Sequence, residues 1–148
     1  MYQRLFDQFV NGNNTLRVYK SNKLIFASDK DRLLPLIEYL EKSASRHRNV
    51  VIFDKILGRA AALLCVNANC REVYSPLGSQ LAIEELGKRG ITYHLTRTIP
   101  RIQTPEGKMC PMEALSIGKE PEEFYQLIKR SRFISKSEYR DYHGAQTE

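Results

Sequence analysis

The chain has 148 residues, of which 42% are hydrophobic and 27% are charged, proportions that are ordinary for a soluble globular protein. This length fits a single domain, and no hydrophobic run approaches the length that spans a membrane. The formal net charge of +6 permits an anionic partner, but positive residues concentrate only near the C-terminus. We therefore expect no membrane partner, and we rank nucleic acid low among the partners.

The cysteines and the N-terminus indicate the compartment. Cys65, Cys70 and Cys110 form an odd set without Cys-x-x-Cys spacing, which is typical of reduced thiols in a cytosolic protein. The first residues, Met1–Asp7, lack the apolar core of a signal peptide. These patterns predict a cytoplasmic protein.

The spacing of apolar residues predicts helices and strands that alternate along most of the chain. In chain order we expect a helix over Tyr2–Val10, strands over Thr15–Tyr19 and Lys23–Ala27, a helix carrying Leu33–Leu40, a strand over Val50–Phe53, a helix over Ala60–Val66, a strand over Glu72–Ser75, a helix capped by Ser79, a strand over Ile91–Thr96, and helices that begin near Cys110 and Pro121.

Short polar segments join these elements. Ser21-Asn22 lies between the first two strands and favours an antiparallel hairpin. Asp29 or Asp31 is placed to cap the helix that follows. We expect Pro76–Gly78 to form a turn and Arg97–Lys108 to form a long loop.

A hairpin followed by repeated strand–helix units predicts an α/β protein with one mixed sheet and helices on both faces. We assign residues 1–130 to a single domain and residues 131–148 to a polar, basic C-terminal tail. The local concentration of positive charge spans this boundary and consists of Lys129, Arg130, Arg132, Lys136 and Arg140.

The centre of the chain carries the strongest pattern. Val50–Phe53 is an unbroken β-branched and aromatic run, which indicates a strand covered on both faces. Ala60–Val66 is apolar on every side, which indicates a buried helix. The charged turn between them falls at the carboxyl end of the strand, where ligands of α/β proteins tend to bind.

Three segments together resemble a small family of uncharacterised domains with a cytidine-deaminase-like fold. They are Asp54–Leu63, Glu72–Ser75 and Met109–Glu113. The resemblance implies a three-layer αβα sandwich with a mixed five-stranded sheet, in a family whose activity is unassigned. It also implies that a homo-oligomer is plausible.

The zinc chemistry of deaminases is not expected here. That chemistry needs His-x-Glu and Pro-Cys-x-x-Cys, which supply the metal ligands and the proton shuttle. His47, His94 and His143 are not followed by Glu at the second position, and Gly58–Ala61 stands where the cysteine motif would fall. We predict no metal site, no zinc-dependent deamination and no cofactor, and whether the chain is an enzyme stays open.

The turn after the central strand is the leading ligand-binding candidate. A helix N-terminus with Lys55 and Arg59 beside it suits a phosphate or carboxylate, and Gly58 lets the backbone approach a ligand closely. Asp54 can accept a hydrogen bond from a ribose hydroxyl or a base amine. The alternative is a surface helix start at which Asp54 pairs with Lys55 or Arg59.

Two further groups are expected to border the same crevice. Ser75, Gly78 and Ser79 follow the next strand and offer N–H and hydroxyl donors, although a simple turn and cap explains them as well. Cys110 precedes Pro111 at a helix start, where a thiol's pKa can fall. Glu113 is placed to bond back to the Cys110 N–H, as in a capping box, and the alternative is a small buried sulfur at a plain helix start.

These observations favour a protein that binds a small anionic ligand, a nucleotide or nucleotide-sugar, at the carboxyl edge of the sheet. The first alternative is a thiol-dependent enzyme with Cys110 as nucleophile and Glu113 as acid/base. The second is a protein or RNA interaction module that uses the basic C-terminal segment.

Overall fold

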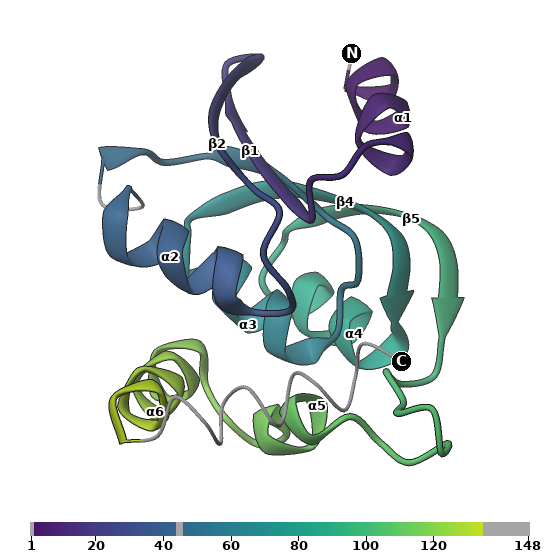
Figure 1. Ribbon diagram of the computed structural model, residues 1–148, viewed down its shortest axis with the longest axis vertical. Coiled ribbons are helices and arrows are strands. Elements are labelled where there is room, and N and C mark those ends of the chain that lie inside the picture. Colours follow the sequence, from purple (N-terminus) through teal and green to yellow (C-terminus); the bar gives the residue numbers. More distant parts are fainter. Residues whose placement is uncertain (1, 44–45, 135–148) are drawn as a thin grey trace.

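A computed structural model of the chain describes residues 2–43 and 46–134. It contains one five-stranded sheet in the order β2-β1-β3-β4-β5 (Figure 1). The first three strands in this order pair antiparallel, whereas β3, β4 and β5 run parallel, so the predicted mixed sheet is confirmed. The strands are β1 (Leu16–Lys20), β2 (Lys23–Ser28), β3 (Val50–Asp54), β4 (Cys70–Ser79) and β5 (Thr92–Ile99).

The predicted hairpin joins β1 to β2. Ser21 and Asn22 form its two-residue turn with φ of 51° and 67°, the left-handed conformation that matches the twist of antiparallel strands. Small polar residues tolerate that conformation better than bulky ones. The conformational preferences of Ser21 and Asn22 therefore favour this hairpin.

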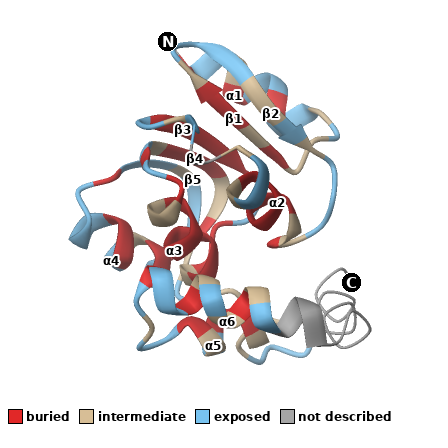
Figure 2. Ribbon diagram, turned by 90° about the vertical axis from the view of Figure 1, so that its left-hand side faces the viewer, coloured by how far each residue is buried: buried red, intermediate tan, exposed pale blue. Residues whose placement is uncertain are grey.

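The helices divide unequally between the two faces of the sheet (Figures 1 and 2). Tyr2 and the aromatic residues of α1 pack over Phe53 and Tyr74 on one face. The opposite face is covered by α2, α3 and α4, and α5 and α6 pack beyond α3 as a further layer. The helices are α1 (Gln3–Asn11), α2 (Leu34–Lys42), α3 (Arg59–Asn67), α4 (Gln80–Lys88), α5 (Pro111–Ser116) and α6 (Pro121–Ile134).

The parallel strands position α3 and α4 on the same face. Each strand–helix–strand crossover is right-handed by rule, and the strands advance in one direction from β3 to β5. The helix starts therefore gather at the carboxyl ends of the strands. As predicted, α3 is buried, since Ala60 through Cys65 are all nearly inaccessible.

Several predicted boundaries were wrong, and the pairing of strands explains two of them. β4 continues through the expected turn Pro76–Gly78, and β5 reaches Ile99 inside the expected loop, because the two strands stay paired as far as Ser79 and Ile99. Neither Asp29 nor Asp31 caps α2, whose N-cap is Leu33 with no side-chain hydrogen bond.

The last helix crosses the predicted domain boundary. α6 continues to Ile134, into the segment predicted to be a tail. Residues 135–148, which include Lys136 and Arg140 of the basic segment, lie outside the described residues. Within the described part of the chain, no helix is both long enough and apolar enough to cross a membrane.

Candidate functional site

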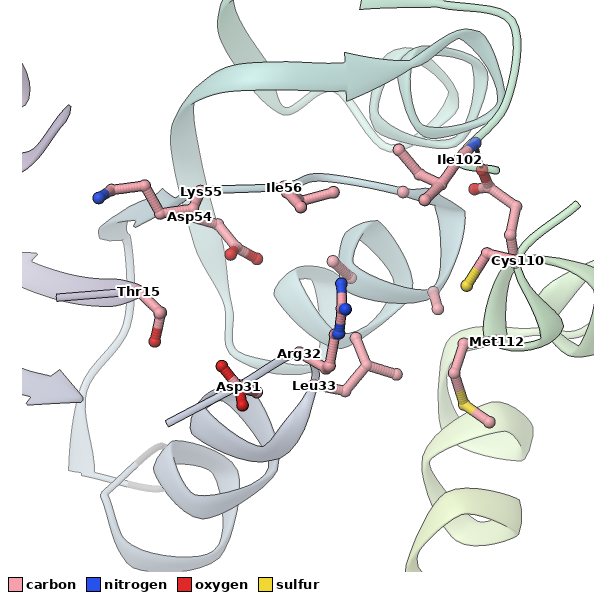
Figure 3. Close-up of a pocket in the computed structure, with 14 residues that line it drawn as sticks. Thr15, Asp31, Arg32, Leu33, Asp54, Lys55, Ile56, Ile102, Cys110 and Met112 are labelled. Carbon is pink, nitrogen blue, oxygen red and sulfur yellow. Dashed lines mark hydrogen bonds between the residues drawn. The ribbon is translucent and has the colours of Figure 1, made fainter. Parts of the chain in front are cut away.

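A cavity of about 290 Å³ lies beyond the carboxyl end of β3 (Figure 3). The start of α2, the start of α3, the segment before α5 and α5 itself enclose it. Its volume is near the lower end of the range for small-molecule sites. The residues that line it are Thr15, Asp31, Arg32, Leu33, Asp54, Lys55, Ile56, Gly58, Ala60, Ala61, Ile102, Cys110, Met112 and Glu113.

Asp54 is the buried acid of this cavity. It is the last residue of β3, and only 6% of its surface is exposed. Burial raises the pKa of the Asp54 carboxyl from its ordinary 3.8 to about 8, although hydrogen bonds from the backbone N–H groups of Ile56 and Lys55 oppose this shift. At neutral pH most of the carboxyl is therefore protonated, and it can both donate and accept a hydrogen bond.

Arg32 is the cation that faces the cavity. Figure 3 shows its guanidinium and the Asp54 carboxyl both turned toward the centre of the cavity. The Arg32 Nε is buried without a hydrogen-bond partner, and burial lowers the pKa of the guanidinium. The backbone holds Arg32 at φ 60°, a left-handed conformation that non-glycine residues adopt at a cost of about 1–3 kcal/mol. Among the described residues, no ion pair joins Arg32 to Asp54.

The predicted cation Lys55 borders the cavity, but its ammonium group points away from it (Figure 3). The Nζ donates to the Gly12 carbonyl at 2.9 Å and lies 5.0 Å from the centroid of the Phe9 ring. Burial, and after it the charge of Arg17, lowers the pKa of Lys55. Lys55 thus ties the end of β3 to α1.

The N-terminus of α3, predicted to bind an anion, already holds one from the chain itself. Glu113 is 1% exposed, and its Oε1 accepts from the Arg59 backbone N–H and, at 3.2 Å, from the Ser79 hydroxyl. Its Oε2 accepts from the Ile102 backbone N–H. A carboxylate 54 residues away therefore satisfies the helix start.

Gly58 is required for this contact. A Cβ at position 58 would lie 2.9 Å from the Glu113 Oε1 and 2.9 Å from the Ile102 Cγ1, closer than real Cβ atoms come. Gly58 was predicted to let the backbone approach a ligand, and in the structure the group that lies close to it is Glu113.

Arg59 is turned away from the cavity. Its guanidinium donates to the Ser116 carbonyl at 2.7 Å, to the Lys119 carbonyl at 3.3 Å and to the Glu85 carboxylate at 3.3 Å. The Glu85 side chain is only 3% exposed, so this ion pair is shielded from solvent. Arg59 therefore joins α3 to α4 and to the segment after α5.

Ser75, Gly78 and Ser79 lie in the last part of β4, before α4 begins, and they do not line the cavity. The Ser75 hydroxyl donates to the Leu77 carbonyl at 2.9 Å, and Gly78 provides room for Leu95. Ser79 caps α4 as predicted, since its Oγ accepts from the Ala82 N–H at 3.1 Å while it donates to Glu113.

Cys110 lines the cavity at the N-cap of α5, as predicted, but the pKa of its thiol shifts in the direction opposite to the one expected at a helix start. Burial raises the pKa of the thiol, and it outweighs the hydrogen bonds from the Glu113 and Met112 N–H groups that lower it. The Cys110 N–H donates to the Ile102 carbonyl at 2.8 Å, so Glu113 does not close the expected capping box.

The sequence interpretation missed the residues that come from other parts of the chain. Arg32 and Ile102 lie in segments interpreted only as connections, and their neighbours carry no motif. The left-handed backbone at Arg32 is not a property that its residue type predicts. Within residues 2–43 and 46–134, no three His, Cys, Asp or Glu side chains gather as they would around a metal ion.

The fold and the cavity define an α/β protein in which a small-molecule-sized space opens beyond the central strand of a mixed sheet. The chain belongs to DUF1893, a family named for a domain of unknown function, and the profile of this family (TM1506) matches residues 5–131.

A solved structure supports the fold. The crystal structure of a DUF1893 family protein (TM1506) from Thermotoga maritima is similar with a TM-score of 0.72 and 24% sequence identity, over 86% of this chain and 85% of that chain. At this identity the likeness establishes a shared fold. No curated protein matches the chain.

Proposed function

We propose that the chain binds a small molecule of the nucleotide type in the cavity beside Asp54. One observation carries the proposal: a buried carboxyl and a buried, unpartnered guanidinium nitrogen line the same cavity. Buried polar groups in proteins are almost always paired, so an unpaired one at a cavity is a group that a ligand can satisfy.

The chemistry of the lining supports this class of ligand. The surface of the cavity is mostly apolar, which suits the flat or apolar body of a ligand, and the apolar side chains that contribute to it are Leu33, Ile56, Ala60, Ala61, Ile102 and Met112. Asp54 can pair with a ring nitrogen or an amine, because a carboxyl group both donates and accepts when protonated. Arg32 can pair with an anionic group such as a phosphate.

The size of the cavity limits how much of the ligand it can hold. A volume of about 290 Å³ accommodates one ring system, and Asp31 and Ile56 are exposed residues of its lining. We place a heterocycle at Asp54 and the anionic group toward Arg32. Lys55 and Arg59, the cations expected from the sequence, are not assigned to the ligand, because each holds another part of the fold.

A nucleotide panel tests this proposal. Nucleosides, nucleoside monophosphates and nucleotide-sugars are added to the purified chain, and the thermal unfolding midpoint is measured, since a ligand that binds only the folded state raises it. We expect a phosphorylated compound to raise the midpoint, Arg32→Met to abolish most of that rise, and Asp54→Asn to change which base is preferred.

Arg4→Met provides a matched control, since Arg4 is exposed on α1 and lies outside the cavity. It removes the same charge and should leave the rise unchanged. A panel in which no compound shifts the midpoint contradicts the proposal, and so does an equal loss of the rise in Arg32→Met and Arg4→Met.

We also propose that the fold is of the cytidine-deaminase type. The support is the order of elements, in which a helix and a hairpin precede alternating helices and strands.

The prediction of a chain without catalytic zinc rests on the absent sequence motifs. Metal analysis of the purified chain tests it, and one tightly bound zinc per chain would overturn it.

A further inference from the structure

Among residues 2–43 and 46–134, no strand pairs with the outer edge of β5. β5 is the last strand of the sheet, with only β4 beside it among the described residues (Figure 1). Six of its eight residues are exposed, and they are Thr92, Tyr93, His94, Thr96, Arg97 and Thr98. A strand in this position presents a row of backbone N–H and C=O groups on its outer side, and another strand can pair with them.

The opposite edge of the sheet lacks this regularity. β2 starts with Lys23, and its pairing with β1 shifts register between Val18 and Tyr19. Lysine and bulges are common devices that keep an edge strand from pairing. β5 contains no lysine, proline or glycine, and its register against β4 is constant from Thr92 to Ile99. Of the two edge strands of the sheet, β5 therefore lacks the protecting features that β2 has.

The side chains of β5 complement one another when the strand meets its own copy. Tyr93, Leu95 and Arg97 alternate along one face, and Leu95 packs toward Gly78 on the side of the sheet that α4 covers. A twofold axis perpendicular to the sheet and centred on Leu95 places Tyr93 opposite Arg97 of the second copy, twice. A guanidinium over a tyrosine ring is a favourable contact.

The same arrangement avoids a clash of charges. His94, on the other face, falls opposite Thr96 of the second copy. His94 is also bonded to the Glu72 carboxylate at 2.7 Å, so an acid accompanies the imidazole at this edge. Arg97 is the only Lys or Arg of β5.

We propose that two copies of this chain associate through antiparallel pairing of β5 over Thr92–Thr98, with Tyr93 of each copy against Arg97 of the other. The two five-stranded sheets then form one continuous sheet. The surface lies apart from the Asp54 cavity, whose lining includes no residue of β5, so this proposal stands independently of the proposed ligand.

Sedimentation velocity of the full chain over about a hundredfold range of concentration measures the association. We expect a reversible dimer for the wild type. Tyr93→Lys sets a like charge against Arg97 at both contacts and should raise the dimer Kd about tenfold or more. Tyr93→Glu also removes the ring but supplies an ion pair, and it should leave the Kd within about threefold of the wild-type value.

The double variant Tyr93→Lys/Arg97→Glu restores opposite charges, and we expect it to restore the dimer. Position 93 is exposed, and circular dichroism verifies that each variant is folded. A wild-type chain that is monomeric at every concentration overturns the proposal. A dimer with the same Kd for the lysine and glutamate variants of Tyr93 overturns it equally.

Discussion

Asp54 and Glu113 are two buried carboxyl groups on the wall of one cavity, and they differ in the hydrogen-bond donors that surround them. Glu113 accepts hydrogen bonds from two backbone N–H groups and one hydroxyl. Among the described residues, the donors that oppose the pKa shift of Asp54 are the backbone N–H groups of Ile56 and Lys55, and burial nevertheless raises its pKa to about 8. Burial of a carboxyl group therefore does not by itself identify a ligand-binding site. Donors brought from other elements give Glu113 a structural role, and the proposed ligand would supply the partners that Asp54 lacks.

The largest effect is expected from Glu113→Ala. This substitution leaves the buried N–H groups of Arg59 and Ile102 without acceptors, and each such loss costs about 1–3 kcal/mol. The free energy of unfolding, measured by urea denaturation, should fall by about 3–5 kcal/mol. If the alanine variant fails to fold, Glu113→Gln gives a smaller measurable loss, because one oxygen is kept. Glu106→Ala, in an exposed loop, is the control, and an equal loss there would contradict the assigned role.

The second-largest expected effect is on the pH dependence of the free energy of unfolding, to which Asp54 contributes. Because its pKa is about 8 in the folded chain and 3.8 ordinarily, the folded state retains a proton that the unfolded state releases. The contribution of Asp54 to stability is thus present at low pH and is lost as pH rises toward 8. The slope is at most about 1.4 kcal/mol per pH unit.

Asp54→Asn should remove this slope, so that the free energy of unfolding of the variant changes less between about pH 5 and about pH 7.5. Urea denaturation at both pH values measures the difference. Asp7→Asn, on the exposed side of α1, should keep the wild-type slope. Identical slopes in the wild type and Asp54→Asn would show that Asp54 does not hold its proton.

Gly58→Ala is expected to destabilise the chain by about 1–3 kcal/mol, since its Cβ displaces Glu113 or Ile102. Gly87→Ala is a matched control in the exposed part of α4, where a Cβ would meet nothing within 4 Å. The control should be neutral or stabilise by a few tenths to about 1 kcal/mol, because alanine favours helix. The thermal midpoint should therefore fall in Gly58→Ala and stay unchanged or rise in Gly87→Ala.

The smallest effect is expected from Ser79→Ala. It removes the cap of α4 and one of the three donors to Glu113, with a loss of about 1–2 kcal/mol. Threonine at this position keeps the hydroxyl and should recover most of the loss. Combined with Glu113→Ala, the serine substitution should cost less than it does alone, because the two side chains share one contact.

Much of the fold could be predicted from local patterns. The run Val50–Phe53 indicates a buried strand whatever surrounds it, and Ser21-Asn22 favours a hairpin by its own conformational preferences. The lengths of β4 and β5 could not be predicted, because their last residues are strands only through pairing with each other.

The sequence placed a candidate site at the carboxyl end of the central strand, where the cavity lies, but it predicted only some of the residues that line the cavity. Asp54 and Cys110 line the cavity as the order of strands and helices suggested. Cys110 nevertheless has a raised pKa, since desolvation exceeds the effect of the helix start, and desolvation depends on what packs around the thiol.

The sequence by itself determined that a buried strand passes through a charged turn into a buried helix, since the periodicity of apolar residues is a local property. Only the tertiary structure decided which charged groups face the cavity. Lys55 and Arg59 lie within five residues of Asp54 in the sequence but hold other elements, whereas Arg32 comes from a segment before α2. The direction of a long polar side chain depends on where its best partner lies, and such partners are often brought close only by folding.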